Sequence, residues 1–458
     1  MTGKSLPFSS FVCYDGGNTK DEVILMAISQ EYLALHSLWE KAVFGSYLIV
    51  PLKYDEGGLK TDYIRRVFTP MMLTTTDIGE NIKDMINRPG PGNIGQAYSI
   101  PREALEQEML GGHFERMTAR EGDHEGSFSL MDSYLYVFHT QVAFLCLGFA
   151  YEEMATLYHI CNPGFVQMSS EFKRRRPDGE MESFSLEDAL CALAERCGMR
   201  KFFDGVSPAI VESYVYNLAV VPERFPSMEV MRQATFNMHL MTDLNAPAED
   251  ESEEDLRYVY AVKTQSLGSY RWGCCVSSQT INYVQADAEM NLARQMDIQA
   301  EDGLPVVMLA LYEKFTCLRF TELLSQSMGQ DARHLDGLKK MMLKFQAYGT
   351  VTPSNLSRWH NVKHIYAALL EVNDTATAVS DIDAKLSILA EQQKVIEQRK
   401  SDTVTGIITV FGVVSIVDST LSIVQSLSGG AALDWMTVGG TLLSLGVVTA
   451  VMLRLLKK

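Results

Sequence analysis

Residues 404–424 have the sequence VTGIITVFGVVSIVDSTLSIV, and residues 436–453 have the sequence MTVGGTLLSLGVVTAVML. The first stretch carries a single charged residue, Asp418, and the second carries none. Each is close to the ~20 apolar residues with which a helix crosses a bilayer. The pair predicts a two-helix transmembrane hairpin within residues 404–458. Two buried core helices are the less favoured interpretation.

The charges that flank the two stretches predict an orientation. Arg399 and Lys400 precede the first stretch and three basic residues follow the second, whereas residues 425–434 contain no Lys or Arg. Basic flanks favour the cytoplasmic side of a membrane. We therefore expect a multi-pass protein of the inner (cytoplasmic) membrane, with both termini in the cytoplasm and the lipid bilayer as a partner.

The composition of the chain is that of a large folded body. Of its 458 residues, 47% are apolar and 21% are charged, which excludes a disordered chain. Its 40 Lys and Arg against 57 Asp and Glu give a net charge of −17, which disfavours binding to a nucleic acid polymer. The eight cysteines contain no CxxC pair and indicate reduced thiols.

Strand and helix signals alternate through about residue 300. Stretches rich in β-branched and aromatic residues predict strands at 45–54, 133–149, 255–265 and 270–284, the last two forming a hairpin. Helical spacing is found at 186–199 and 288–298. We therefore predict a cytosolic α+β domain at residues 1–300, which is a candidate for ligand sensing.

After Pro305 only helix signals remain. Helices are predicted at 306–328, at 334–348 and from Leu356 onward. No Pro or Gly interrupts Leu356 to Thr405, and apolar residues recur there at steps of three and four. Such spacing of apolar residues is typical of a coiled-coil seam. Residues 301–403 are thus predicted to be a helical stalk region that enters the first apolar stretch as one rod.

Small and polar residues recur on one stripe of the first apolar stretch. They are Thr405, Thr409, Gly412, Ser415, Asp418, Ser419, Ser422 and Gln425. A polar stripe on a membrane helix faces protein or water, so these residues are predicted to line a pore. In an oligomer, copies of Asp418 would form a ring that selects cations. The alternative is that Asp418 lies near the interface or bonds a neighbouring helix.

Two charge clusters occur in the body. An acidic run lies at residues 249–255 and is interpreted as a solvated loop or a cation sensor. The dense basic cluster consists of Lys173, Arg174, Arg175 and Arg176. It suits a phosphate-bearing ligand or an anionic headgroup, with a solvated loop as the alternative.

Enzyme signatures are missing from the sequence. It contains no GxGxxG, GxxxxGK[ST], HExxH or GxSxG pattern, and its histidines form no metal-ligand spacing. We expect a protein that is not an enzyme. No cofactor or metal ligand can be assigned.

The predicted architecture resembles the CorA-type divalent-cation transporters. Local similarity lies in LYEKFTCLRF at 311–320 and LKFQAYGTVTPSNLSRWHNVKHIY at 343–366. The resemblance implies a homopentamer in which the first span lines a pore for ions such as Mg²⁺. The Gly-Met-Asn signature of the family is absent from residues 422–430, where Gln425 is a candidate substitute. Family members associated with type III CRISPR systems are proposed to open on binding a nucleotide messenger, an adenylated S-adenosylmethionine.

Three functional hypotheses follow. The first is a ligand-gated, CorA-like membrane channel of the CRISPR-associated antiviral type, opened by a nucleotide messenger. The second is a magnesium or divalent-cation transporter. The third is a membrane-anchored enzyme or scaffold. The absent signature favours the first over the second, and the polar stripe disfavours the third.

Overall fold

The computed structural model describes most of the chain between residues 41 and 428. The described ranges are 41–113, 117–121, 124–161, 171–175, 179–205, 207–222, 225, 228–241, 259–263, 270–286, 291–327 and 332–428. The chain divides into two compact units, Met1–Ile382 and Asp383–Lys458.

A large mixed sheet forms the body of the first unit. In the described ranges its strands are β1 (Val43–Lys53), β2 (Thr69–Pro70), β3 (Gly95–Ile100), β4 (Met117–Glu121), β5 (His124–Leu130), β6 (Ser133–Phe138), β7 (Val142–Tyr151), β8 (Glu171–Arg175), β9 (Met181–Phe184), β10 (Arg200–Lys201), β11 (Tyr214–Val221), β12 (Val259–Lys263), β13 (Tyr270–Val276) and β14 (Thr280–Ala286). Ten lie side by side in the order β12-β13-β14-β11-β1-β7-β5-β4-β8-β9, and the others pair off this path.

The middle of the sheet is buried on both faces. Every residue of β1 from Phe44 to Lys53 is buried, and β1 is antiparallel to β7 on one side and to β11 on the other. β11 and β14 are parallel, with Val215 opposite Thr280. The amino ends of these two strands therefore meet at one edge of the sheet.

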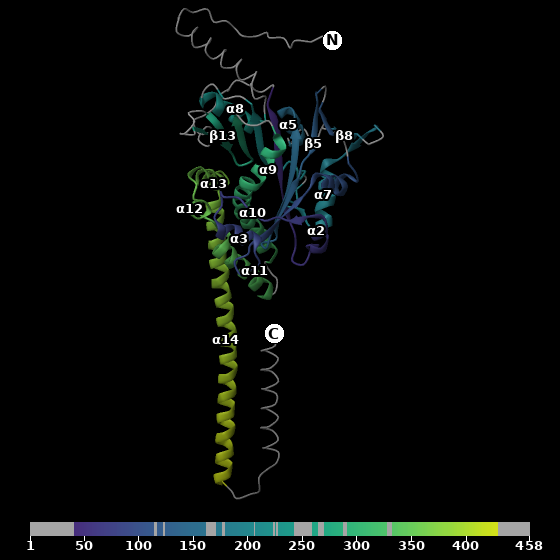
Figure 1. Ribbon diagram of the computed structural model, residues 1–458. Helices are drawn as coiled ribbons and strands as arrows, with labels where there is room; N and C mark the ends of the chain where they lie inside the picture. Colours follow the sequence, from purple (N-terminus) through teal and green to yellow (C-terminus); the bar gives the residue numbers. More distant parts are fainter. Residues whose placement is uncertain are drawn as a thin grey trace, which may run out of the picture. The chain divides into compact units, whose positions relative to one another are not determined.

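The described ranges contain helices as well as strands. They are α2 (Thr61–Val67), α3 (Glu80–Asn87), α4 (Arg102–Leu110), α5 (Met154–Cys161), α7 (Leu186–Cys197), α8 (Met228–Leu240), α9 (Leu292–Asp302), α10 (Leu304–Ser327), α11 (Ala332–Lys344), a π-helix (Phe345–Gly349), α12 (Pro353–Leu356), α13 (His360–Val372) and α14 (Thr375–Ser428). Figure 1 shows α9 and α10 on one side of the strands and α2 and α7 on the other.

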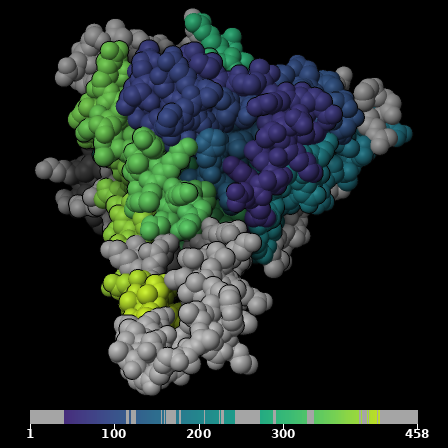
Figure 2. Space-filling model, turned by 90° about the horizontal axis from the view of Figure 1, so that it is seen from below, coloured from purple at the N-terminus to yellow at the C-terminus, as the bar shows by residue number. Residues whose placement is uncertain are grey.

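The segment after residue 300 packs against the N-terminal part of the body. Figure 2 shows the green residues beside the purple and blue ones. At α12 and α13, Gly79 N donates to Leu356 O over 2.8 Å, and Trp359 Nε1 donates to Thr76 O over 3.2 Å. The α12–α13 region is therefore attached to the loop that precedes α3.

A network of ion pairs fastens α10 to the end of β1. Lys53 Nζ lies 2.7 Å from both Asp204 and Glu322, and Arg319 lies 2.9 Å from both Glu322 and Asp55. The Lys53 and Arg319 side chains are almost fully buried. Buried charges are tolerated only when they are paired in this way.

Several predicted elements are confirmed. The strand predicted at 45–54 is β1, and the predicted hairpin pairing is found between β12 and β13. The single strand predicted at 270–284 is wrong, because that stretch forms β13 and β14, which pair antiparallel with each other. The helix predicted at 186–199 is α7, which Ser185 caps by accepting from Asp188 N. Its end follows from Gly198, whose φ of 79° terminates the helix.

The long strand predicted at 133–149 is wrong. It consists of β6 and β7, an antiparallel pair that turns near Thr140 and Gln141. Gln141 has a φ of 65°, which breaks the extended conformation. The polar residues at this turn, His139, Thr140 and Gln141, include no Gly, Pro, Asn or Asp, so the usual turn signals are missing from the sequence.

The predicted transmembrane hairpin is also wrong. In the part of the chain that the structure describes, no helix combines the length and the apolar character needed to cross a membrane. The fold class with a membrane hairpin and the inner-membrane location are corrected on this finding. The second stretch, 436–453, lies outside the described residues.

The single rod predicted from Leu356 onward is interrupted. α13 ends at Val372 and α14 begins at Thr375. Between them Asp374 has a φ of 50°, a conformation in which the short polar side chains of Asp and Asn are tolerated. From Thr375 the helix does continue through the first apolar stretch, to Ser428.

Candidate ligand-binding site

A cavity lies at the edge of the sheet where the parallel strands β11 and β14 begin. Its volume is about 450 Å³, within the range of about 300–1,000 Å³ of small-molecule sites. The walls come from the segment after β10, the turn before β11 and the start of that strand, the β13–β14 turn, the end of α8 and one face of α10. They include Phe203, Glu212, Tyr214, His239, Thr280, Lys314 and Phe315. We call it the Lys314 cavity.

Lys314 supplies a half-buried positive charge to this cavity. Its Nζ donates to Asn373 Oδ1 over 2.8 Å and lies 5.9 Å from the ring centre of Phe315. Among the described residues no carboxylate lies within ion-pair distance of this ammonium group. Burial lowers the pKa of Lys314. A half-buried cation held by a neutral amide is a favourable place for an anion.

Acceptor and hydroxyl groups lie on the opposite walls. Burial raises the pKa of the Glu212 carboxyl, and this effect is larger than the opposite effect of the Lys201 charge. Thr280 Oγ1 lies 2.9 Å from His239 Nδ1 and accepts from Asn282 Nδ2 over 2.9 Å. The cavity thus combines a cation, a carboxylate and a hydroxyl group on rigid elements.

Aromatic rings form the apolar part of the cavity. Phe203 is 39% exposed, and its ring centre lies 6.0 Å from that of Phe315 in an edge-to-face arrangement. The Tyr214 hydroxyl donates to Ser277 O over 3.0 Å, which fixes its ring at the start of β11. Such rings suit a flat heterocycle.

Lys314 also contacts the junction between α13 and α14. Its acceptor, Asn373, is 6% exposed and donates through Nδ2 to Leu369 O over 2.8 Å. Asp374 then turns the chain and α14 begins at Thr375. The Lys314 ammonium group is thus bonded directly to a residue of this junction.

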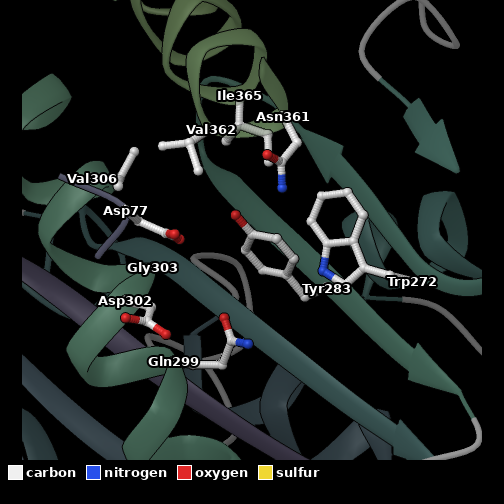
Figure 3. A pocket seen from close by; sticks show the side chains of 10 residues that line it. All are labelled: Asp77, Trp272, Tyr283, Gln299, Asp302, Gly303, Val306, Asn361, Val362 and Ile365. Carbon is white, nitrogen blue, oxygen red and sulfur yellow. The ribbon is translucent and has the colours of Figure 1, made fainter. Parts of the chain in front are cut away.

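A second cavity lies beside the first half of α13 (Figure 3). Figure 3 shows Asp77 and Asp302 facing Trp272, with Tyr283 between them and Asn361 above. Its volume is only about 140 Å³, well below the range of small-molecule sites. Burial, with a contribution from Asp302, raises the pKa of Asp77. Of these two cavities, the Lys314 cavity alone has the volume of a small-molecule site.

The basic cluster predicted at 173–176 lies partly in β8. Arg174 donates to Leu110 O over 2.7 Å and pairs with Glu182 over 3.1 Å. It therefore joins β8 to β9 and to the end of α4. Lys173 is half-buried and Arg175 is exposed, and Arg176 lies outside the described residues. The ligand-binding role of this cluster stays a prediction.

The predicted pore-lining residues belong to α14. Thr405, Thr409 and Gly412 are exposed, and Thr409 Oγ1 donates to Thr405 O over 2.7 Å within the helix. The remaining side chains of the set lie outside what the structure describes. These are Ser415, Asp418, Ser419, Ser422 and Gln425.

Sequence reasoning missed the residues of the Lys314 cavity, yet a signal for them existed. Lys314 follows Glu313 in an otherwise apolar segment of α10, where Arg319 is also fully buried. Charged residues inside an apolar helix require nearby partners or a ligand. The partners could not be named from the sequence, because Asn373 lies 59 positions along the chain.

Comparisons with known proteins identify no relative. No protein-family model matches the chain, and no curated protein or solved structure matches it significantly. The resemblance to CorA transporters stays a prediction. The expected membrane, ion-channel and magnesium-transport characters are corrected, because no described helix is long and apolar enough to cross a membrane. No family model or relative supports a CRISPR-associated antiviral role. The homopentamer stays a prediction.

Proposed function

We propose that this protein is a ligand-responsive regulator. In this proposal the Lys314 cavity binds a small phosphate-bearing ligand of the nucleotide class, and its occupied state is passed to α14. The observation that carries the proposal is the hydrogen bond between Lys314 Nζ and Asn373 Oδ1, which joins the cavity to the α13–α14 junction. The role is binding rather than catalysis, because the sequence has no catalytic motif.

The groups of the cavity support a nucleotide-like ligand. A phosphate would gain a charge-assisted hydrogen bond from Lys314, a stronger bond than the ammonium group makes to an amide. Glu212 would accept from ribose hydroxyls, and Phe203 and Phe315 would contact the base. A cavity of about 450 Å³ has room for a mononucleotide but not for a polymer.

The signal to α14 would arise from competition for one cation. When phosphate draws the Lys314 ammonium group toward the cavity, the bond to Asn373 weakens. Asn373 then keeps only its bond to Leu369 O. A buried amide oxygen that loses its donor is destabilised by about 1–3 kcal/mol, enough to shift a two-state equilibrium.

The test is binding of AMP and of adenosine to the full chain by calorimetry. Lys314→Met keeps the length of the side chain but removes its charge. We expect it to weaken AMP binding at least tenfold and to leave adenosine binding nearly unchanged, because adenosine has no phosphate. Lys340→Met, at an exposed lysine of α11, is the matched control.

Hydrogen exchange measures the transmission step. AMP should increase exchange of the amides at residues 370–382 in the parent but not in Lys314→Met. If Lys314→Met binds AMP as tightly as the parent does, the cavity is not the phosphate site. If AMP binds but exchange at the junction is unchanged, binding and signalling are not coupled through Asn373.

A further inference from the structure

Two histidines stand one turn apart on the outer face of α13. His360 and His364 are both exposed, and their ring centres lie 4.1 Å apart with an angle of 58° between the ring planes. Neither side chain enters the Lys314 cavity or the cavity of Figure 3. The pair is therefore not explained by the proposed function.

The helix that carries the pair is rigidly held. The opposite face of α13 is buried against the body through Val362, Ile365, Tyr366, Ala368 and Leu369. Tyr366 also donates through its hydroxyl to Glu313 Oε1 over 2.8 Å. The two imidazoles are thus placed on a fixed backbone before any ligand arrives, so binding to them would require little ordering of the chain.

The spacing and separation of the rings suit a shared metal ion. Histidines at i and i+4 of a helix project from one face, the arrangement with which helical zinc sites supply two ligands. A metal ion lies about 2.1 Å from each imidazole nitrogen. Rings already 4.1 Å apart reach that geometry by small rotations of the side chains. Imidazole selects zinc, copper and nickel over magnesium or calcium.

We propose that His360 and His364 form a two-ligand site for a divalent transition-metal ion. Among the described residues, no group of three or more His, Cys, Asp and Glu side chains could hold a metal ion. The remaining coordination positions of the ion are therefore filled by water or by a group from another molecule. A bound ion would tie the first turn of α13 to the second and so stabilise the start of this helix.

Calorimetric titration of the full chain, without an affinity tag and after treatment with a chelator, tests the site. We expect NiCl₂ and ZnCl₂ to bind, MgCl₂ to give no heat, and binding of nickel to weaken as the pH falls, because protons compete for the imidazole nitrogens. His364→Gln keeps a polar side chain but removes one ligand, and should lower the nickel affinity of this site at least tenfold.

The control is Lys363→Ala, on the same turn of α13, which should bind nickel as the parent does. A second readout is thermal: nickel should raise the unfolding temperature of the parent and of Lys363→Ala but not that of His364→Gln. If His364→Gln keeps the nickel affinity and the thermal shift of the parent, the pair is not a metal site. That result would leave AMP binding by the Lys314 cavity untouched, so the two proposals fail separately.

Discussion

Glu313 is a buried carboxyl group at the contact between α10 and α13. It is 4% exposed, and its Oε1 accepts from Val351 N and from the Tyr366 hydroxyl, each over 2.8 Å. Burial raises its pKa from the usual 4.5 to about 7, against the smaller opposite effect of these two bonds. The folded protein therefore holds a proton that the unfolded chain releases at lower pH.

This shift predicts a pH dependence of stability. Between pH 4.5 and about 7 the folded state binds more protons at Glu313 than the unfolded state does. The contribution of protonated Glu313 to stability is therefore lost as the pH rises through that window. Glu313→Gln keeps both acceptor bonds without the charge. In urea unfolding we expect the unfolding free energy of Glu313→Gln to equal that of the parent near pH 4.5. At pH 8 it should be larger than that of the parent, by a difference on the order of 3 kcal/mol.

The exposed Glu301→Gln is the control, and its stability relative to the parent should not change between the two pH values. An equal difference between Glu313→Gln and the parent at both pH values would mean that folding does not raise the pKa of Glu313.

Arg319 is the residue on which the buried ion-pair network depends. It is fully buried, pairs with Asp55 and Glu322, and donates to Tyr54 O and Gln141 Oε1. After Arg319→Met, Asp55 keeps Arg200 and Glu322 keeps Lys53, but Tyr54 O and Gln141 Oε1 lose a donor, so we expect a loss of about 1–3 kcal/mol in unfolding free energy. Arg200→Met removes a pair to the same Asp55 with a side chain that is 44% exposed. Arg200→Met should lower the unfolding free energy by about 1 kcal/mol or less.

At the scale of elements, the junction of α9 and α10 depends on Gly303. A Cβ atom there would lie 2.3 Å from the Tyr216 hydroxyl oxygen. We expect Gly303→Ala to destabilise the protein by about 1–3 kcal/mol, because the ring of Tyr216 is fixed in β11. In the double variant with Tyr216→Phe the closest remaining atoms are Gln299 Oε1 at 3.1 Å and Tyr216 Cζ at 3.2 Å.

A double-mutant cycle in urea measures this contact. Tyr216→Phe alone should lower the unfolding free energy by about 1–3 kcal/mol, because Gln299 Oε1 loses its buried donor. If the contact with the hydroxyl is the cause, the double variant is clearly more stable than the sum of the two single losses predicts. If the losses of the two single variants add up, Gly303→Ala destabilises the helix junction without involving the Tyr216 hydroxyl.

Elements with strong local signals were predictable, and elements defined by distant partners were not. α7 carries its own cap in Ser185 and its own stop in Gly198, so its limits follow from the sequence. β11 is buried along its whole length and was missed, because its apolar run has neither alternation nor turn signals of its own. The break at Asp374 was missed for a related reason, since a positive φ at Asp has no reliable signature in one sequence.

The residues of the candidate site likewise divide into those with a local sequence signal and those that only the fold brings together. The basic cluster at 173–176 was conspicuous because its charges are adjacent in the sequence, yet Arg174 fastens β8 to its neighbours. The groups of the Lys314 cavity come from five separate parts of the chain, and the parallel pairing of β11 and β14 brings two of these parts together. No single-sequence pattern reports such a pairing.

At the scale of the whole molecule, the first unit should fold without the end of the chain. It extends to Ile382 and contains the sheet, the Lys314 cavity and the cavity of Figure 3. The buried residues of α14 in the described ranges include Ile382 and Leu386, both before Lys400. A fragment that ends at Lys400 therefore keeps all of these contacts.

We expect this fragment to unfold in urea at the same midpoint as the body of the full chain, because the removed residues contribute none of the contacts just named. Its binding of AMP should equal that of the full chain. Self-association should be weaker in sedimentation experiments, since exposed apolar residues such as Ile408, 51% accessible, are removed with the helix. A lower midpoint would show that residues after Lys400 stabilise the body. An unchanged association constant would place the contact between copies on the first unit or on the part of α14 before Lys400, where Ile388 is 55% exposed.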